Sequence, residues 1–162
     1  MKSLLGGLLM VKVSIVGPGD GELIANGPAH IRILEDGSNT GHRLGIGEVV
    51  IPPHTPGPPQ HRHAQHDEGF YVLSGNVRFT IGVDDHDVGP GTWVTVPPGA
   101  PHTFANPGDE PAVMLTTFTP DLYVQYFRDL KAMVESGRPM TRETMAPIWK
   151  NYATEPSTEF AP

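Results

Sequence analysis

The sequence contains no cysteine, so the chain forms no disulfide and offers no thiolate ligand to a metal. Cysteine usage therefore leaves its redox compartment open. Basic residues are also few: 11 Lys and Arg stand against 18 Asp and Glu, for a formal net charge of -7. No cluster of Lys or Arg offsets this charge, so the composition argues against a nucleic-acid partner.

Long hydrophobic runs are absent as well. The apolar segment over residues 1–10 is too short to span a bilayer, Lys12 follows it closely, and no small-residue cleavage site comes after it. We therefore expect a cytoplasmic protein without a membrane partner, whose translation starts at Met1 or at Met10.

Turn-forming residues, in contrast, are abundant, with 19 Gly and 18 Pro spread over 162 residues. Turn-formers between short apolar runs predict an all-β fold of many strands, and the length suits one domain. Tight turns are expected over residues 84–87 and at residues 74–76, the latter as a hairpin with Gly75 at its first central position. The expected strands cover residues 11–16, 22–26, 29–35, 42–51, 70–73, 77–81, 93–96, 102–105 and 113–118.

The hydrophobic period changes from two to that of a helix after residue 118. The segment 119–121 reads Thr-Pro-Asp, which predicts a helix start with the threonine as N-cap. Apolar residues every three or four positions over 122–134 predict one buried helix face. A second short helix is expected over 141–152, bent or split at Pro147, followed by a loose tail.

Two spaced histidine motifs carry the chemistry of the chain. His61 and His63 are two positions apart, so on a strand their side chains project from the same face. Glu68 is an odd number of positions from His63, so a turn or bulge around residues 65–67 must restore its direction. With His102, three imidazoles and a carboxylate are enough to bind one divalent transition metal, and Fe, Mn, Ni, Co and Zn all remain open.

The spacing of these residues resembles the two motifs of the cupin superfamily. The second motif, G-x5-P-x-G-x2-H-x3-N, is met at every position, by Gly91, Pro97, Gly99, His102 and Asn106. The first motif, G-x5-H-x-H-x4-E-x6-G, is met except at its opening glycine, where the sequence has Thr55. This resemblance implies a double-stranded β-helix (jelly-roll) barrel with metal held by His61, His63, Glu68 and His102.

On this resemblance the chain divides into four segments. They are an N-terminal extension with an edge strand (1–20), the cupin barrel (21–119), short C-terminal α-helices (120–152) and a flexible tail (153–162). A cupin barrel exposes sheet edges, and the apolar segment 11–16 is suited to pairing with an edge of a second subunit. We therefore expect a symmetric homodimer.

The C-terminal arrangement of strand and helices is similar to that of small single-domain bacterial cupins grouped with quercetin dioxygenases. In those enzymes the glutamate that resembles Glu68 is thought both to ligate the metal and to accept the hydroxyl proton of the substrate. The resemblance thus implies a metal-dependent dioxygenase acting on a small aromatic or enolisable compound, with Glu68 as the catalytic base. Two alternatives use the same ligands: a redox-neutral isomerase or cyclase, and a non-catalytic module that binds a small ligand or a metal.

Three residues near the motifs are candidates for a pocket. By strand parity, Phe70 points the same way as Glu68 and Phe104 the same way as His102, so they either line a pocket or pack in the core. His66 falls between the ligands and is expected to be an exposed loop residue, with a polar group beside the metal as the alternative.

Overall fold

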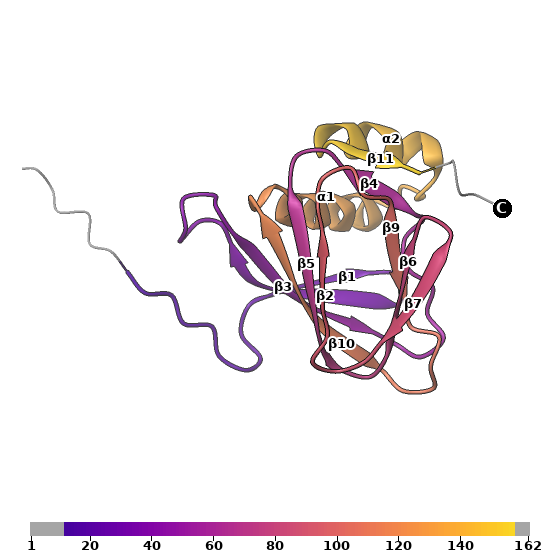
Figure 1. Cartoon of the computed structure of the whole chain (residues 1–162). Helices are drawn as coiled ribbons and strands as arrows, with labels where there is room; N and C mark the ends of the chain where they lie inside the picture. The colour runs from indigo at the N-terminus through magenta and orange to yellow at the C-terminus, as the bar shows by residue number, and fades with distance from the viewer. Residues whose placement is uncertain (1–11, 158–162) are drawn as a thin grey trace, which may run out of the picture.

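Two β-sheets form a barrel in the computed structural model, which describes residues 12–157 (Figure 1). In spatial order, the six-stranded sheet contains β1 (Glu22–Asn26), β2 (Ala29–Asp36), β3 (Gly45–Ile51), β10 (Ala112–Thr119), β5 (Asp67–Ser74) and β8 (Trp93–Val96). The five-stranded sheet contains β11 (Thr154–Pro156), β4 (His61–His63), β9 (His102–Ala105), β6 (Val77–Ile81) and β7 (Asp84–Val88). The predicted all-β jelly-roll barrel is confirmed.

The barrel interior is formed by every second side chain of its strands. In β3 and β10 every second residue is buried, because successive side chains of a strand point to opposite faces of the sheet. The inward residues of both sheets pack into one core, in which Phe79, Met114 and Val72 are almost completely buried. Strands distant in sequence are neighbours: β10 lies between β3 and β5, and β4 pairs with β9.

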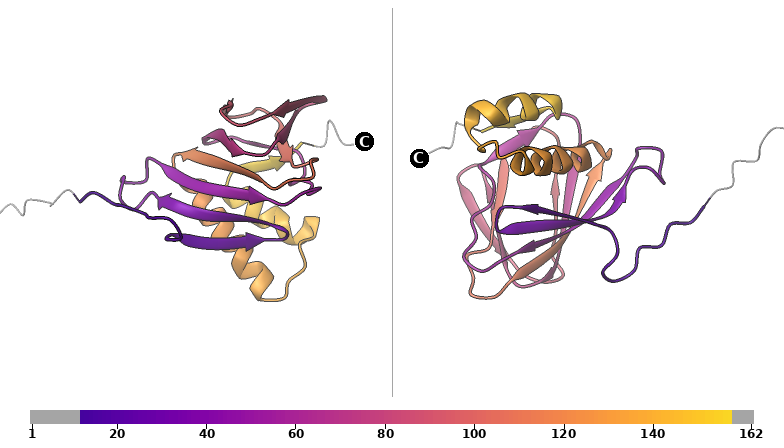
Figure 2. Two further views of the ribbon diagram at one scale, coloured as in Figure 1. Left: turned by 90° about the horizontal axis from the view of Figure 1, so that it is seen from below. Right: turned by 180° about the vertical axis from the view of Figure 1, so that it is seen from behind.

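Two helices, α1 (Leu122–Glu135) and α2 (Arg142–Asn151), lie across one end of the barrel (Figures 1 and 2). The predicted buried face of the first helix is present at Tyr126, Leu130 and Met133, and Tyr123 is buried in addition. The second helix begins with a capping box at Thr141 and continues through Pro147 as one helix. Both predicted helices are therefore confirmed, and the second is not split. Among the described residues, no helix has both the length and the apolar character needed to cross a membrane.

The start of α1 differs from the prediction. Strand β10 continues to Thr119, and the N-cap position is occupied by Asp121, whose side chain makes no capping hydrogen bond. Its Oδ2 atom instead lies 2.9 Å from Nδ1 of His42. The carboxylate thus joins the helix start to the loop before β3, a contact that the local Thr-Pro-Asp pattern does not contain.

Two predicted turns are corrected. Residues 84–87 form most of β7, which pairs with β6, and the chain reverses at Gly82, whose φ is 63°. Residues 74–76 form no hairpin, because they lead from β5 in one sheet to β6 in the other. Gly75 does have the positive φ expected of it, 71°, and a Cβ atom there would lie 2.4 Å from the carbonyl oxygen of Pro111.

The two ends of the chain also differ from the predictions. Residues 12–16 belong to no strand, so the strand predicted over 11–16 is not formed within the single chain; residue 11 lies outside the described residues. At the other end, the tail predicted to be flexible forms β11, which pairs with β4, and Ser157 is buried. Residues 158–162 lie outside the described part.

Candidate metal centre

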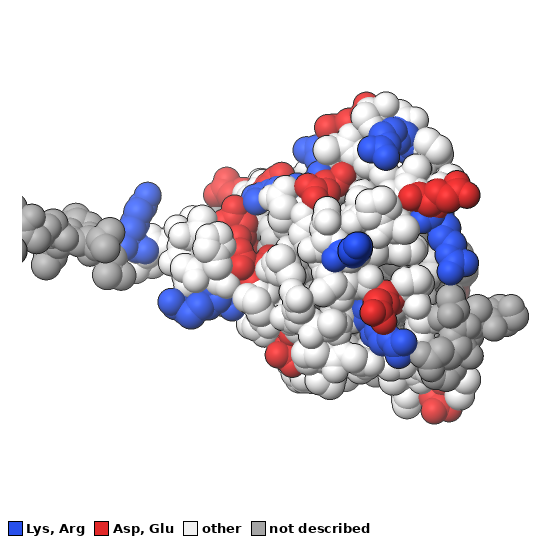
Figure 3. Space-filling model, turned by 90° about the horizontal axis from the view of Figure 1, so that it is seen from above, with Lys and Arg blue, Asp and Glu red and all other residues white. Residues whose placement is uncertain are grey.

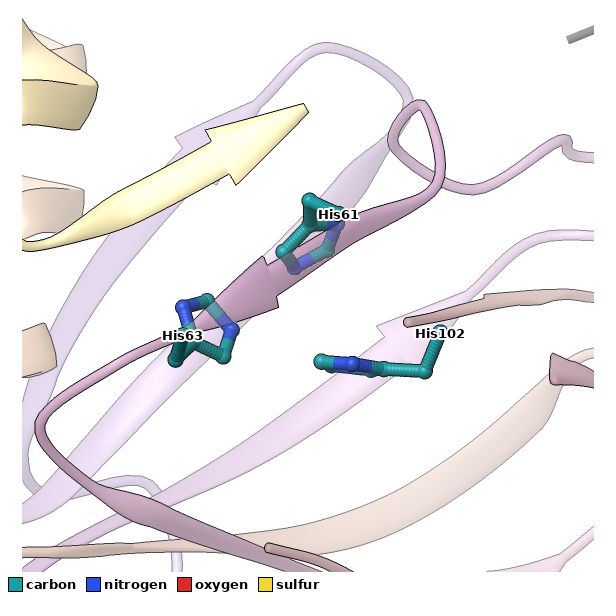
Figure 4. Close-up of side chains that lie close together, drawn as sticks. All are labelled: His61, His63 and His102. Atoms are coloured by element: carbon teal, nitrogen blue, oxygen red, sulfur yellow. The ribbon is translucent and has the colours of Figure 1, made fainter. Parts of the chain in front are cut away.

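Strands β4 and β9 bring three histidines together. His61 lies directly opposite His102 in the β4–β9 pairing, and His63 follows on the same face of β4. The ring of His61 lies 4.6 Å from that of His102 and 4.8 Å from that of His63, centroid to centroid. Figure 4 shows the three imidazoles facing a common space. One ligand atom from each lies within 4.8 Å of those of the other two, close enough to hold a metal ion.

Glu68, near the start of β5, completes this arrangement. The chain turns between β4 and β5, over residues 64–66, and the carboxylate consequently points at the histidines. Its Oε2 atom lies 3.0 Å from Nε2 of His102 and 3.4 Å from Nε2 of His63. The residue is only 4% exposed, so this negative charge is held inside the barrel.

Hydrogen bonds fix the tautomers of the three imidazoles. In each ring Nδ1 faces an oxygen that can accept a hydrogen bond, so a ring that binds a cation carries its proton on Nδ1 and keeps the lone pair on Nε2. These bonds run from His61 to the Pro59 carbonyl (2.8 Å), from His102 to the Ala100 carbonyl (3.0 Å) and from His63 to Thr154 Oγ1 (3.0 Å). The three Nε2 atoms are thereby available as ligands.

The protonation of the cluster suits a cation. Burial, together with the neighbouring His102 and His63, lowers the pKa of His61 to about 3, and burial also lowers the pKa of His63. Burial by itself raises the pKa of Glu68, but the contacts with the surrounding imidazoles outweigh it and hold that pKa well below its usual value. Nε2 of His63 is buried without a hydrogen-bond partner. Nε2 of His102 lies within hydrogen-bonding distance of Oε2 of Glu68, at 3.0 Å, and a divalent cation bound among the four groups would take the place of the proton in such a contact.

His66 belongs to the same cluster, so the expectation of an exposed loop residue is wrong. Its side chain is completely buried, and its Nε2 lies 3.5 Å from Oε1 of Glu68. Its ring lies 4.3 Å from that of His63. His63, His66 and Glu68 form a second group of converging ligand atoms. The structure instead agrees with the alternative interpretation of His66, in which it is a polar group beside the candidate metal position.

Comparison with known proteins identifies the family. A protein-family model for the cupin domain matches residues 47–118. The crystal structure of a candidate sugar phosphate isomerase from Acidithiobacillus ferrooxidans ATCC 23270 is 30% identical, and the match covers 61% of this chain and 67% of that one, with a TM-score of 0.52. The chain belongs to the cupin superfamily. Its predicted family is thus confirmed, and the described residues form one small cupin domain.

Other solved structures share the fold of this cupin at lower identity. The polyketide cyclase RemF from Streptomyces resistomycificus is 22% identical, with a TM-score of 0.60 over 67% of this chain and 80% of that one. KdgF from Halomonas sp. is 17% identical, with a TM-score of 0.59 over 67% of this chain and 94% of that one. At these identities the likeness concerns the fold alone. No curated protein sequence gives a significant match.

A cavity of about 620 Å³ adjoins the histidine and glutamate cluster of the cupin. His61 and Glu68 form part of its wall, together with two of the three candidate pocket residues, Phe70 and Phe104, whereas His66 does not line it. Further aromatic side chains come from β10 and the helices, among them Phe118, Tyr123, Tyr126 and Trp149. The helices therefore close one side of a mainly apolar chamber that has the cluster in its wall.

Two residues of the C-terminal segments lie at the cluster, and the motifs did not reveal them. Tyr123 of α1 has its ring 4.5 Å from that of His63 and 4.8 Å from that of His66. Thr154 of β11 accepts the Nδ1 proton of His63. Nothing in the local sequence distinguishes Tyr123 from the other aromatic residues of the first helix, and nothing local marks Thr154.

Proposed function

We propose that this cupin is a metal-dependent dioxygenase that acts on a small aromatic or enolisable compound. The observation that carries the proposal is the position of His61 and Glu68 in the wall of a 620 Å³ cavity with largely apolar, aromatic surroundings. Such a cavity takes up an organic ligand and excludes water, while a few polar groups orient the reacting atoms.

In this proposal the metal ligands are Nε2 of His61, His63 and His102 and Oε2 of Glu68. The burial of His63, Glu68 and His102 and the oxygen acceptor beside Nδ1 of each imidazole support this assignment. Three imidazoles and one carboxylate suit Fe, Mn, Ni, Co or Zn, and the ligand set does not choose among them. When bound, the ion supplies Lewis-acid polarisation of a substrate oxygen and, if it is redox-active, activation of dioxygen.

Glu68 is also the proposed catalytic base. Its Oε2 atom faces His102 and His63, whereas Oε1 faces His66 at 3.5 Å. One carboxylate oxygen can thus ligate while the other accepts a proton from a substrate hydroxyl in the cavity. The lowered pKa keeps the carboxylate ionised, which is the state that accepts a proton.

The lining of the cavity supports an aromatic rather than a phosphorylated substrate. Aromatic walls favour stacked or edge-on packing against a planar ligand. Among the described residues, Arg142 is the one Lys or Arg that lines the cavity, and it is exposed. Over the helix-covered end of the molecule, acidic and basic side chains are interspersed and form no continuous basic patch (Figure 3). A phosphate group would require a denser set of cationic partners.

A redox-neutral reaction is the second candidate. The 30% identity to a candidate sugar phosphate isomerase favours it, and an isomerase or cyclase would use the same cluster and the same base without dioxygen. Polar residues in the cavity wall, including Thr55 and Thr116, could orient such a substrate.

The test combines elemental analysis of the purified protein with oxygen uptake over a panel of flavonols and catechols. We expect one transition metal ion per chain and oxygen consumption that depends on it. Turnover without oxygen uptake would favour the redox-neutral enzyme. Tight binding of a panel compound without any turnover would favour a non-catalytic module, and a protein that binds no transition metal would refute the proposal.

A further inference from the structure

We infer that Thr154, on the C-terminal strand β11, is a positioning residue that holds His63 as a metal ligand. The inference rests on the metal site proposed above and goes beyond it, because Thr154 lies outside both histidine motifs. It assigns a direct role at the centre to a C-terminal strand that the cupin motifs do not include.

The direction of the hydrogen bonds carries the inference. A threonine hydroxyl has one proton, and that of Thr154 is donated to the Tyr152 carbonyl at 3.2 Å. The oxygen of Thr154 therefore accepts at its contact with His63, the 3.0 Å hydrogen bond from Nδ1. The bond fixes the proton of His63 on Nδ1 and leaves Nε2 bare beside Glu68. Thr154 and His63 are 4% and 2% exposed, so water does not replace this partner readily.

The pairing of β11 with β4 sets the position of Thr154. Thr154 lies opposite His63 and Pro156 opposite His61, so the whole of β11 runs along the strand that carries two of the proposed ligands. Figure 4 shows this strand, in yellow, beside the strand with His61 and His63. Backbone hydrogen bonds hold both ends: Ala64 N–H donates to the Ala153 carbonyl at 2.9 Å and Ser157 N–H to the Gln60 carbonyl at 2.8 Å.

The same segment also covers the cavity. Helix α2 contributes Met145 and Trp149 to the cavity wall and leads through Tyr152 directly into β11. The Tyr152 hydroxyl donates to Asp129 of α1 at 2.5 Å, which joins the two helices. Docking of the C-terminal segment therefore both closes the cavity and orients His63. By thermodynamic linkage, a metal that binds the oriented imidazole also stabilises the docked segment.

The test measures Co²⁺ affinity in matched variants. Thr154→Val has the same shape but no acceptor, and we expect its Co²⁺ affinity to fall about 10- to 100-fold with an altered Co²⁺ absorption spectrum. Thr154→Ser keeps the hydroxyl and should restore both affinity and spectrum. Thr117→Val is the control, because Thr117 is a half-buried threonine of β10 that does not line the cavity, and this variant should bind Co²⁺ like the wild type.

A second measurement needs no variant. In the wild type, Co²⁺ should slow hydrogen exchange of the backbone amides of α2 and β11, and unchanged exchange would overturn the inference. Equal Co²⁺ affinity of Thr154→Val and wild type would also overturn it, as would an equal loss in Thr154→Ser, which would point to packing alone. A wild-type protein that binds no Co²⁺ or other transition metal would refute the metal site itself as well.

Discussion

At the scale of single residues, the cluster gathers groups that each need a positive partner. Nδ1 of His61 and of His102 faces a backbone carbonyl, at 2.8 and 3.0 Å, so the Nε2 atoms of both rings point inward. Glu68 adds a buried negative charge to these lone pairs. The proposed site assigns metal binding to each of these side chains, and His66 is a further candidate ligand beside Glu68.

Removing one imidazole should therefore release the metal. His61→Ala and His102→Ala should each lose most of the bound metal, because each variant lacks one proposed ligand. The measurement is elemental analysis of the purified variants. His86→Ala is the control, because this exposed residue lies on β7, away from the cluster, and the variant should keep its metal. Full occupancy in both ligand variants would contradict the ligand assignment.

The role of Glu68 as a base can be separated from its role as a ligand. Glu68→Gln keeps an oxygen that can bind a metal but cannot accept a proton, so turnover per bound metal should fall by about 10²-fold or more. The rate must be normalised to the metal content measured in the same sample. Equal normalised rates would remove the catalytic role and leave only metal binding.

Only part of this cluster could be predicted from the sequence, because spacing along a strand shows some of its contacts and long-range folding decides the others. The spacing of His61 and His63 on a strand and the second motif around His102 identify positions that a barrel brings together. The burial of His66 depends on how the turn over residues 64–66 folds inward, which spacing does not describe. Thr154 reaches His63 across 91 positions of sequence, and no local pattern encodes such a contact.

At the scale of elements, strands with one buried face were predictable and polar edge strands were not. The alternation of β3 and β10 indicates their buried faces directly. Strand β7 reads Asp-Asp-His-Asp-Val and its first four residues are exposed, so its composition is that of a turn. It is a strand because it pairs with β6, where Arg78 binds Asp87 at 2.6 Å. Long-range pairing outweighs local propensity at such an edge.

The loop after β9 depends on a buried asparagine. The Asn106 amide donates to the carbonyls of Ile51, Pro52 and Glu110 at 3.0, 3.1 and 2.8 Å, and its oxygen accepts from Gly108 N–H at 3.0 Å. Asn106→Ala should lower the free energy of unfolding by ~3 kcal/mol, because several backbone groups lose their partner. Chemical denaturation measures this change.

The matched control for that substitution is Asn76→Ala. Asn76 is exposed, so its substitution should change the free energy of unfolding by less than ~0.5 kcal/mol. Equal stability of Asn106→Ala and the wild type would show that the loop does not depend on this side chain.

At the scale of the whole molecule, the core and the metal cluster are separate sources of stability. The core consists of inward side chains from both sheets and α1, among them Phe79, Met114 and Leu130, and none of these three is a proposed metal ligand. After chelation the protein should therefore still melt cooperatively, at a lower temperature than with metal. Calorimetry before and after chelation checks this, and a chelated sample without a cooperative transition would contradict it.

The segment ahead of β1 bears on assembly. Val13 and Ile15 are 79% and 88% exposed on residues 12–16, which pair with no strand in the single chain. Alternating apolar residues left in solvent favour pairing with a sheet edge of a second copy, which would bury them. We expect a symmetric homodimer, and sedimentation that finds only a 17.5 kDa species at micromolar concentration would count against it.

The same segment offers a variant that tests how the dimer forms. Val13→Asp combined with Ile15→Asp places charge on the side of the extended segment that pairing would bury, so it should shift the protein to monomers. Ser14→Asp is the control, because it adds a charge on the opposite side of the same segment and should leave the dimer intact. A dimer that survives the double substitution would have to form through another surface, and the role assigned to residues 12–16 would be wrong.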